Sequence, residues 1–179
     1  LAANQNYSEA QYNLGVIYSE GKYISRDIDK AIYYYSLASN QNNVEAQFNL
    51  GVIYSEGKYV TRDINKAIYY YSLAANQNYS EAQYNLGVIY LEGKYIVRDI
   101  NKAIYYYTLA ANKNYSKALN NLGVIYSKGL YITRDINKAI YYYSLAAKQN
   151  YSDALNNLGV IYLEGKYVTR DIDKAIYYY

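Results

Sequence analysis

Residues 30–38 read KAIYYYSLA, and the stretch returns at 66–74, at 102–110 with Thr in place of Ser, and at 138–146. A further copy begins at Lys174 and runs to Tyr179. The spacing of 36 residues holds along the whole chain, and a period between about 20 and 50 residues is the signature of a solenoid or repeat array. We therefore expect one array, an excerpt of a longer chain, with five repeats at about 8–43, 44–79, 80–115, 116–151 and 152–179, the last of them truncated.

The composition excludes several classes of functional site. The chain has no Cys and no His, so most nucleophilic, general-base and zinc sites cannot be built from it. We expect no catalytic residue, no metal and no cofactor. The net charge is only +3, with acids and bases mixed in every repeat, which argues against a nucleic-acid partner. No apolar run approaches the ~20 residues of a membrane span, so we expect no membrane insertion.

Each repeat predicts two helices. In the first repeat, apolar residues at helical spacing place the first helix at about residues 9–19, and Gly21 stands where a helix should stop. Ser8 followed by Gln11 is a capping-box pattern. Asp27 is expected to cap the second helix, and Asn42 to take the left-handed conformation after that helix ends. The fold class is therefore predicted to be all-α, a stack of helical hairpins.

Glycine recurs inside the first helix of every copy, at 15, 51, 87, 123 and 159. Glycine in a helix costs ~1 kcal/mol relative to alanine, so its presence in every copy needs a packing reason. We expect these glycines to mark close helix crossings.

The stretch EAQYNLGVIYSEGKYISRDIDKAIYYYSLA (9–38) resembles the Sel1-like repeat, a relative of the tetratricopeptide repeat. The shared marks are A-x-x-N-L-G-x-x-Y in the first helix, D-x-x-K-A in the second, and paired aromatics before LA. The resemblance covers the entire chain. It implies a right-handed α-α superhelix of paired antiparallel helices that serves as an adaptor or scaffold in protein complexes. Some members act in membrane-associated quality control and others in signalling, and the lack of Cys argues against the cysteine-rich secreted subgroup.

The three consecutive tyrosines of each copy cannot share one helix face. At ~100° per residue, Tyr35 lies at the centre of the apolar stripe, Tyr34 on its flank within reach of an adjacent repeat, and Tyr33 on the opposite face. We expect Tyr35 to be buried and Tyr33 to be exposed. The exposed rings form an outer strip, one per repeat, which either docks a partner or reflects compositional drift, and the second interpretation is favoured: Tyr33, Tyr69, Tyr105, Tyr141 and Tyr177.

A second candidate surface follows from the resemblance. Groove-facing positions of the tetratricopeptide relatives align here with five residues of the first helix, namely Glu9, Tyr12, Val16, Ser19 and Glu20. The Tyr12 column is aromatic in three repeats and an amide in two, namely Tyr12, Phe48, Tyr84, Asn120 and Asn156, and the adjacent column is Val16, Val52, Val88, Val124 and Val160. These rows either bind an extended or helical peptide or pack between consecutive first helices. Asn13 and its equivalents lie beside the rows, and such amides more often hydrogen-bond a neighbouring turn than clamp a peptide.

We therefore predict a scaffold or adaptor for a protein or peptide partner, acting through the groove or the outer tyrosine strip, and not an enzyme. Two alternatives stay open: a regulatory or docking arm of a larger signalling enzyme such as a protein kinase, and an adaptor in secretory-pathway quality control. We expect no nucleic acid and no small-molecule substrate, and a cytoplasmic location.

Overall fold

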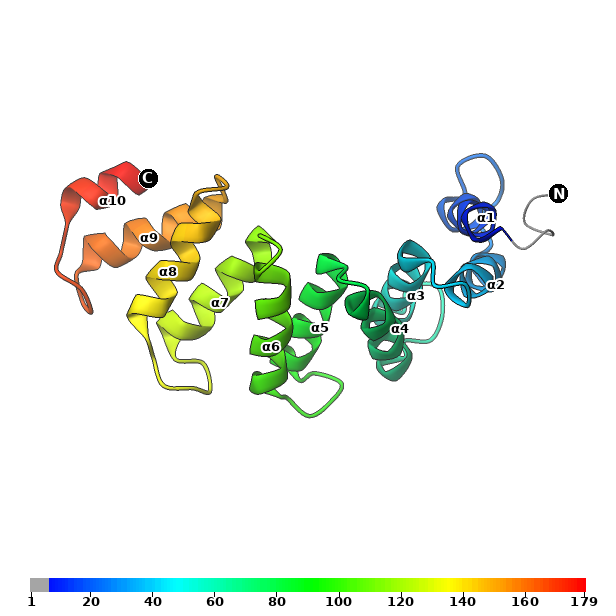
Figure 1. Cartoon of the computed structure of the whole chain (residues 1–179), viewed down its shortest axis with the longest axis horizontal. Helices are drawn as coiled ribbons and strands as arrows, with labels where there is room; N and C mark the ends of the chain where they lie inside the picture. The colour runs from blue at the N-terminus through cyan, green and yellow to red at the C-terminus, as the bar shows by residue number, and fades with distance from the viewer. Residues whose placement is uncertain (1–6) are drawn as a thin grey trace. The chain divides into compact units, whose positions relative to one another are not determined.

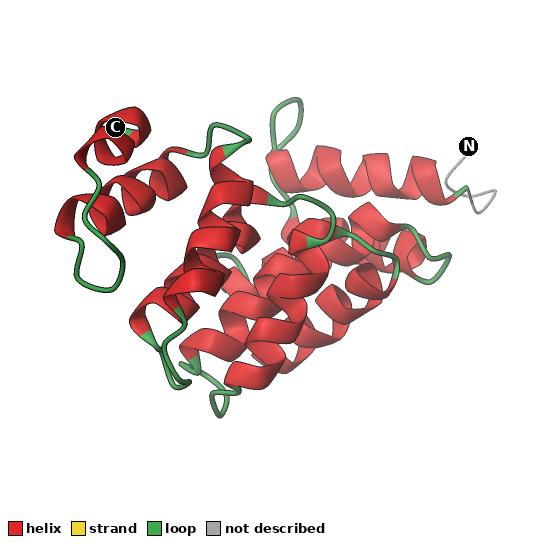
Figure 2. Cartoon of the chain, turned by 60° about the vertical axis from the view of Figure 1, so that its left-hand side comes forward, coloured by secondary structure: helices red, strands yellow, loops and turns green. Residues whose placement is uncertain are grey.

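A computed structural model describes residues 7–179, and within this range all regular structure is helical (Figures 1 and 2). The first helices of the repeats are α1 (Ser8–Glu20), α3 (Val44–Glu56), α5 (Ser80–Glu92), α7 (Ser116–Lys128) and α9 (Ser152–Glu164). The second helices are α2 (Ile28–Ser39), α4 (Ile64–Asn76), α6 (Ile100–Ala111), α8 (Ile136–Ala147) and α10 (Ile172–Tyr178). The expected all-α fold, with two helices in each repeat, is confirmed.

The chain divides into two compact units, which we describe separately. The first unit comprises residues 1–86 and 94–97, and the second comprises residues 87–93 and 98–179. In the first unit, α1 pairs with α2 and α3 with α4, while α3 also packs on α2 and touches α1. In the second unit, α7 pairs with α8 and α9 with α10, while α9 packs on α8 and touches α7. The junction of the first two repeats and that of the last two thus each bring two first helices and one second helix together.

The predicted helix ends are largely confirmed. Gly21 takes a left-handed conformation (φ 66°) and its amide donates to the Ile17 carbonyl, which closes α1. The Asp27 side chain accepts a hydrogen bond of 2.9 Å from the Lys30 amide and caps α2. Asn42 has φ 61°, as expected for the residue that reverses the chain after α2. These signals depend only on neighbouring residues, so the sequence pattern was sufficient to find them.

The capping box at Ser8 is wrong. Ser8 is the first residue of α1, and the cap position is Tyr7, whose side chain makes no capping hydrogen bond. Gln11, the expected partner in the box, is 2% exposed and accepts a 2.7 Å hydrogen bond from the Gln41 side chain instead. In the second repeat Asn43 does cap α3, accepting from the Ala46 amide at 2.8 Å. Ser8 lies one residue too late in the chain to perform that role.

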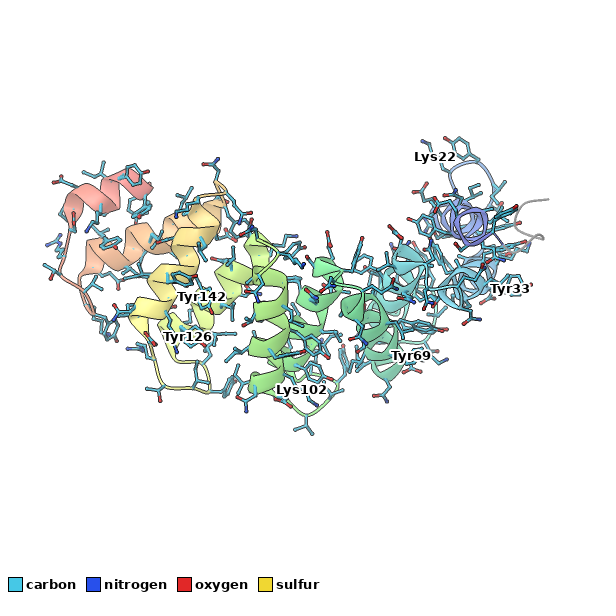
Figure 3. The ribbon with its side chains drawn as sticks, viewed as in Figure 1. Lys22, Tyr33, Tyr69, Lys102, Tyr126 and Tyr142 are labelled. Atoms are coloured by element: carbon cyan, nitrogen blue, oxygen red, sulfur yellow. The ribbon has the colours of Figure 1, made fainter. Side chains whose placement is uncertain are left out.

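Each tyrosine trio divides as its helical phase predicts. The Tyr35 ring is 2% exposed, whereas Tyr33 is 59% exposed. Tyr34 is half-buried and stacks on Tyr18 of its own repeat, with centroids 5.7 Å apart and planes at 4°. Figure 3 shows the equivalent Tyr126 and Tyr142 rings together between α7 and α8. The reach of this ring to an adjacent repeat is also confirmed, because the hydroxyl of Tyr70 lies within hydrogen-bonding range of Ser36.

The helical glycines make room for the third tyrosine of the trio. A Cβ atom on Gly15 would lie 2.4 Å from Cδ1 of Tyr35, and one on Gly51 would lie 2.5 Å from Cδ1 of Tyr71. Carbon atoms in contact ordinarily stand about 3.5–4.0 Å apart, so any side chain at these positions collides with the ring. The expected close crossing is confirmed, and its partner is the ring that ends each YYY run.

Candidate functional site

An open pocket lies at the junction of the first two repeats, and we call it the first junction pocket. It has a volume of about 340 Å³ and is enclosed by α1, α2, α3 and the loop after α3. Its uncharged wall includes Tyr12, Val16, Tyr35, Asn49, Val52 and Tyr59. The sequence rows containing Tyr12 and Val16 therefore do reach a shared cavity in this unit.

The second junction pocket lies between the fourth and fifth repeats and belongs to the second unit. It has a volume of about 240 Å³, and its wall includes Ser127, Tyr143, Asn157, Val160 and Tyr167. Each of these residues stands three repeats after a wall residue of the first junction pocket, as Asn157 does after Asn49. The second junction pocket is therefore built from positions that also line the first, but Asn120 and Val124, the equivalents of Tyr12 and Val16, are not among its lining residues.

Tyrosine hydroxyls and an amide supply the polar groups of the first junction pocket. The Tyr35 hydroxyl lies 3.1 Å from Ser19 Oγ. Burial raises the pKa of Tyr35, while hydrogen bonds with Ser19 and Asn49 act in the opposite direction. Burial also raises the pKa of Tyr12, and a hydrogen bond with Asn49 again opposes the rise. Asn49 is thus held against two hydroxyls, whereas the sequence favoured a neighbouring turn as the partner of this asparagine row.

The amides that replace the aromatic row form a contact of their own in the second unit. Asn120 is only 7% exposed, and its Oδ1 accepts a hydrogen bond of 3.2 Å from Nδ2 of Asn157. Asn156 is exposed. The predicted row therefore does not act uniformly, because its fourth member is buried beneath the pocket wall and its fifth faces solvent.

The remaining predicted groove residues serve mainly in packing. Phe48 is half-buried, with its centroid 5.7 Å from Tyr71 and 5.1 Å from Tyr79. Tyr84 and Val88 are half-buried in α5. The packing interpretation of this row thus describes Phe48, whereas Tyr12 both packs on Tyr35 at 5.9 Å and lines a pocket.

The outer strip is exposed along the chain. Tyr33, Tyr69, Tyr105 and Tyr141 are each 58–59% exposed, and Tyr177 is 81% exposed. Figure 3 shows Tyr33 and Tyr69 at the outer side of their helices. Each ring stands edge-on against the next tyrosine of its own trio, as Tyr33 does against Tyr34 at 5.1 Å and 75°. This contact within the trio covers part of the surface of each ring without any partner protein. Whether the strip binds anything stays a prediction.

One recurring contact is absent from the expectations. Arg26 lies over the Tyr59 ring at 4.8 Å and donates to the Tyr59 hydroxyl, while its other nitrogens donate to the Ser19 and Glu20 carbonyls. The arginine therefore ties the end of α1 to the loop of the following repeat. The same pairing recurs at 4.3–4.7 Å, in Arg62 with Tyr95, Arg98 with Tyr131 and Arg134 with Tyr167. The sequence does contain a signal for this contact, because an arginine and a tyrosine recur in the exposed loop of every repeat.

The structure offers little that would support chemistry on a bound substrate. Among residues 7–179, no cluster of three or more acidic side chains is arranged to hold a metal ion. The ion pairs found there join each capping aspartate to the lysine three residues later, as Asp27 joins Lys30 at 3.2 Å. Over the same residues, the helices are too short or too polar to cross a bilayer.

Comparison with known proteins gives a consistent result. The model of the Sel1 repeat matches residues 8–43, 44–79, 80–115, 116–151 and 152–179. The chain is similar to a protective antigen of uropathogenic Escherichia coli strains that displays an SLR fold, with 30% identity, a TM-score of 0.92, and coverage of 99% of this chain and 38% of the antigen. It is also similar to a Sel1 repeat protein from Oxalobacter formigenes, with 34% identity, a TM-score of 0.84, and coverage of 99% and 73% of the two chains.

A third structure, cysteine-rich protein B of Helicobacter pylori, is 26% identical with a TM-score of 0.58, covering 77% of this chain and 99% of that one. No curated protein sequence matches the chain. Sel1 repeat proteins are generally protein-interaction scaffolds without catalytic activity. The matched model spans all five repeats and the solved structures share their α-α solenoid, so this chain belongs to the Sel1 repeat family.

Proposed function

We propose that the chain is a non-catalytic scaffold that binds an extended segment of a partner protein in its junction pockets. The observation that carries this proposal is that an open pocket built largely from the same repeat positions occurs in each unit. A surface used for binding at successive repeats is how solenoids hold elongated partners.

The pockets suit a peptide better than a metabolite. Their volumes of about 240 and 340 Å³ fall at or below the lower end of small-molecule sites, and such sites enclose most of their ligand. The junction pockets are open to solvent and offer valine and tyrosine surface beside one amide. A peptide side chain can occupy the apolar part while its backbone bonds the amide, which is the pattern of extended-peptide recognition.

The test uses the full chain and a phage library of random 12-residue peptides. Val52→Arg fills the first junction pocket and Val160→Arg the second, and both valines are at least partly exposed, so the fold should tolerate the change. The matched control carries Tyr69→Glu and Tyr141→Glu on the outer strip. We expect selected peptides to be lost from the pocket variants and retained by the control.

Loss of the peptides from the strip variant alone would assign binding to the outer tyrosines. Retention by every variant, or no selected peptide at all, would overturn the proposal. Circular dichroism at 222 nm checks that each variant keeps its helices.

A further inference from the structure

The two junction pockets differ in charge. The charged residues lining the first junction pocket are Glu20, Glu56 and Lys58. Those lining the second are Lys128, Glu164 and Lys166, at the equivalent positions. Only one of these positions differs in charge, because Lys128 stands where the first pocket has Glu20. The charged side chains therefore leave one negative charge in excess in the first pocket and one positive charge in excess in the second.

Lys128 is available to a ligand. It is exposed at the end of α7, and its side chain takes part in no ion pair or hydrogen bond within residues 7–179. Lys166, in contrast, lies over the Tyr167 ring at 5.3 Å, and Arg134 lies over the same ring at 4.4 Å. A hydrogen bond with Lys166, together with the charge of Arg134, lowers the pKa of Tyr167 despite partial desolvation. Two cationic side chains, Lys128 and Lys166, therefore line this pocket against one carboxylate, Glu164, and Arg134 adds a positive charge at the Tyr167 ring. The resulting potential favours an anionic group.

Helix stability does not explain the change of charge. A lysine in the last turn of α7 is favourable to the helix dipole, since cations are stabilised at that end. The same helix, however, has Lys117 in its first turn, where the other repeats have Glu or Asp and where a cation is unfavourable. Both ends of α7 have gained a lysine, so the two effects on the helix oppose each other.

We propose that the second junction pocket takes an aspartate or glutamate side chain of an extended peptide, and that Lys128 sets this preference. The carboxylate accepts a charge-assisted hydrogen bond from Lys128, while the apolar neighbours of the acidic residue lie against Val160. The first junction pocket has Glu20 at the position of Lys128 and lacks the preference. This inference rests on the proposed function, because it assigns a ligand chemistry to one of the pockets.

The test selects peptides from the random 12-residue library on four forms of the chain, namely wild type, Val160→Arg, Lys128→Glu and Glu20→Lys. Peptides that bind the wild type but not Val160→Arg are those that occupy the second junction pocket. We expect them to be enriched in Asp and Glu at one position, and Lys128→Glu to replace that enrichment with Lys and Arg. Glu20→Lys, the reverse change at the first pocket, is the matched control and should leave this subset unaltered.

Synthetic versions of the selected peptides then give affinities by fluorescence polarisation. They are amidated at the C-terminus, so that only a side-chain carboxylate can provide the negative charge. We expect Lys128→Gln to weaken binding by about threefold and Lys128→Glu by about tenfold, as for a partly solvated ion pair. A peptide whose acidic residue is replaced by its amide should bind wild type and Lys128→Gln equally.

The outcomes separate this inference from the proposed function. Pocket-dependent peptides without acidic enrichment, or with enrichment that Lys128→Glu leaves unchanged, would overturn the role of Lys128 and leave the scaffold intact. If Val160→Arg removes no peptide, the second junction pocket does not bind and this inference falls, and the proposed function falls with it only if Val52→Arg removes none either.

Discussion

The pairing of a helical glycine with the last tyrosine of each trio is the contact that most directly tests the packing. The change is Gly51→Ala in α3. A methyl group there would lie 2.5 Å from Cδ1 and 2.6 Å from Cε1 of Tyr71. The ring cannot easily move away, because it is 2% exposed, its hydroxyl lies 3.1 Å from Ser55 Oγ, and its centroid is 5.7 Å from Phe48.

The expected magnitude is the balance of two effects. Alanine is the better helix former by about 1 kcal/mol, which favours the variant. Overpacking of a well-filled core costs roughly 1–3 kcal/mol, and disturbing the Tyr71 hydrogen bond adds about 1 kcal/mol. We therefore expect Gly51→Ala to lower the free energy of unfolding by about 1–3 kcal/mol.

The assay is urea unfolding followed by circular dichroism, in a double-mutant cycle. Tyr71→Ala removes the Cγ, Cδ1 and Cε1 atoms that would collide, so in that background Gly51→Ala should raise stability by about 1 kcal/mol through helix propensity alone. Tyr69→Ala, which removes the exposed ring of the same trio, is the matched control and should leave the cost of Gly51→Ala unchanged. Because repeat arrays can lose cooperativity, the curves are fitted to a nearest-neighbour model. An equal effect of Gly51→Ala in the wild-type and Tyr71→Ala backgrounds would refute the crossing.

Three further predictions concern caps, buried amides and pH. Asn43→Ala should lower the melting temperature, since it removes a cap worth about 1 kcal/mol, whereas Ser152→Ala should have little effect because the serine makes no capping bond. Gln47→Leu should lower the free energy of unfolding by about 1 kcal/mol more than Gln83→Leu does. Both changes remove a side-chain bond to a backbone carbonyl, but Gln47 also accepts a 2.8 Å bond from Gln77, whereas the Oε1 atom of Gln83 is buried without a partner. Burial raises the pKa of Tyr143. The stability that follows from keeping this hydroxyl protonated in the folded state is therefore complete below the unfolded pKa of about 10, and it is lost as pH rises through the higher folded pKa. The free energy of unfolding measured across this range should depend less steeply on pH in Tyr143→Phe.

The fold could be predicted because its determinants are local or periodic. Asp27 caps α2 by accepting a hydrogen bond from the amide of Lys30, three residues later in the chain. Tyr35 is buried because its position in the helical period places it on the apolar face. The capping prediction at Ser8 was wrong by one residue, because Ser8 is the first residue of α1 and Tyr7 occupies the cap position. A pattern of residue types locates a helix end only to within a residue or two.

The junction pockets were predicted only in part. The rows containing Tyr12 and Val16 follow from the resemblance to tetratricopeptide relatives, and both residues line the first junction pocket. Tyr59 comes from the loop of the next repeat and is held there by Arg26, at a separation of 33 residues. Loop positions have no periodicity from which a direction can be inferred, so the contribution of Tyr59 required the three-dimensional structure.

We expect binding specificity to arise in the columns that vary between copies, and not in those that every copy keeps. Every repeat keeps the glycine and the aspartate cap, so these residues specify the solenoid and nothing about a partner. The sequence at 11–12 is Gln-Tyr, and at 119–120 it is Leu-Asn. Both changes occur together and both affect buried groups: Gln11 and Leu119 are 1–2% exposed, and Asn120 holds the Asn157 amide that lines the second junction pocket.

Such a paired change is not surface drift, because each new side chain requires its own packing or hydrogen-bond partner. The first junction pocket presents an aromatic wall at Tyr12, which accepts many apolar side chains at similar cost. Both pockets include an amide, but Asn49 of the first is hydrogen-bonded to the Tyr12 and Tyr35 hydroxyls, whereas Asn157 of the second is held by the Asn120 amide. A ligand that covers Asn157 without bonding it leaves polar capacity of this amide unpaired, at a cost of about 1–3 kcal/mol. Sites built to hydrogen-bond reject mismatched ligands more strongly than apolar sites do. The second junction pocket is therefore expected to be the more selective of the two.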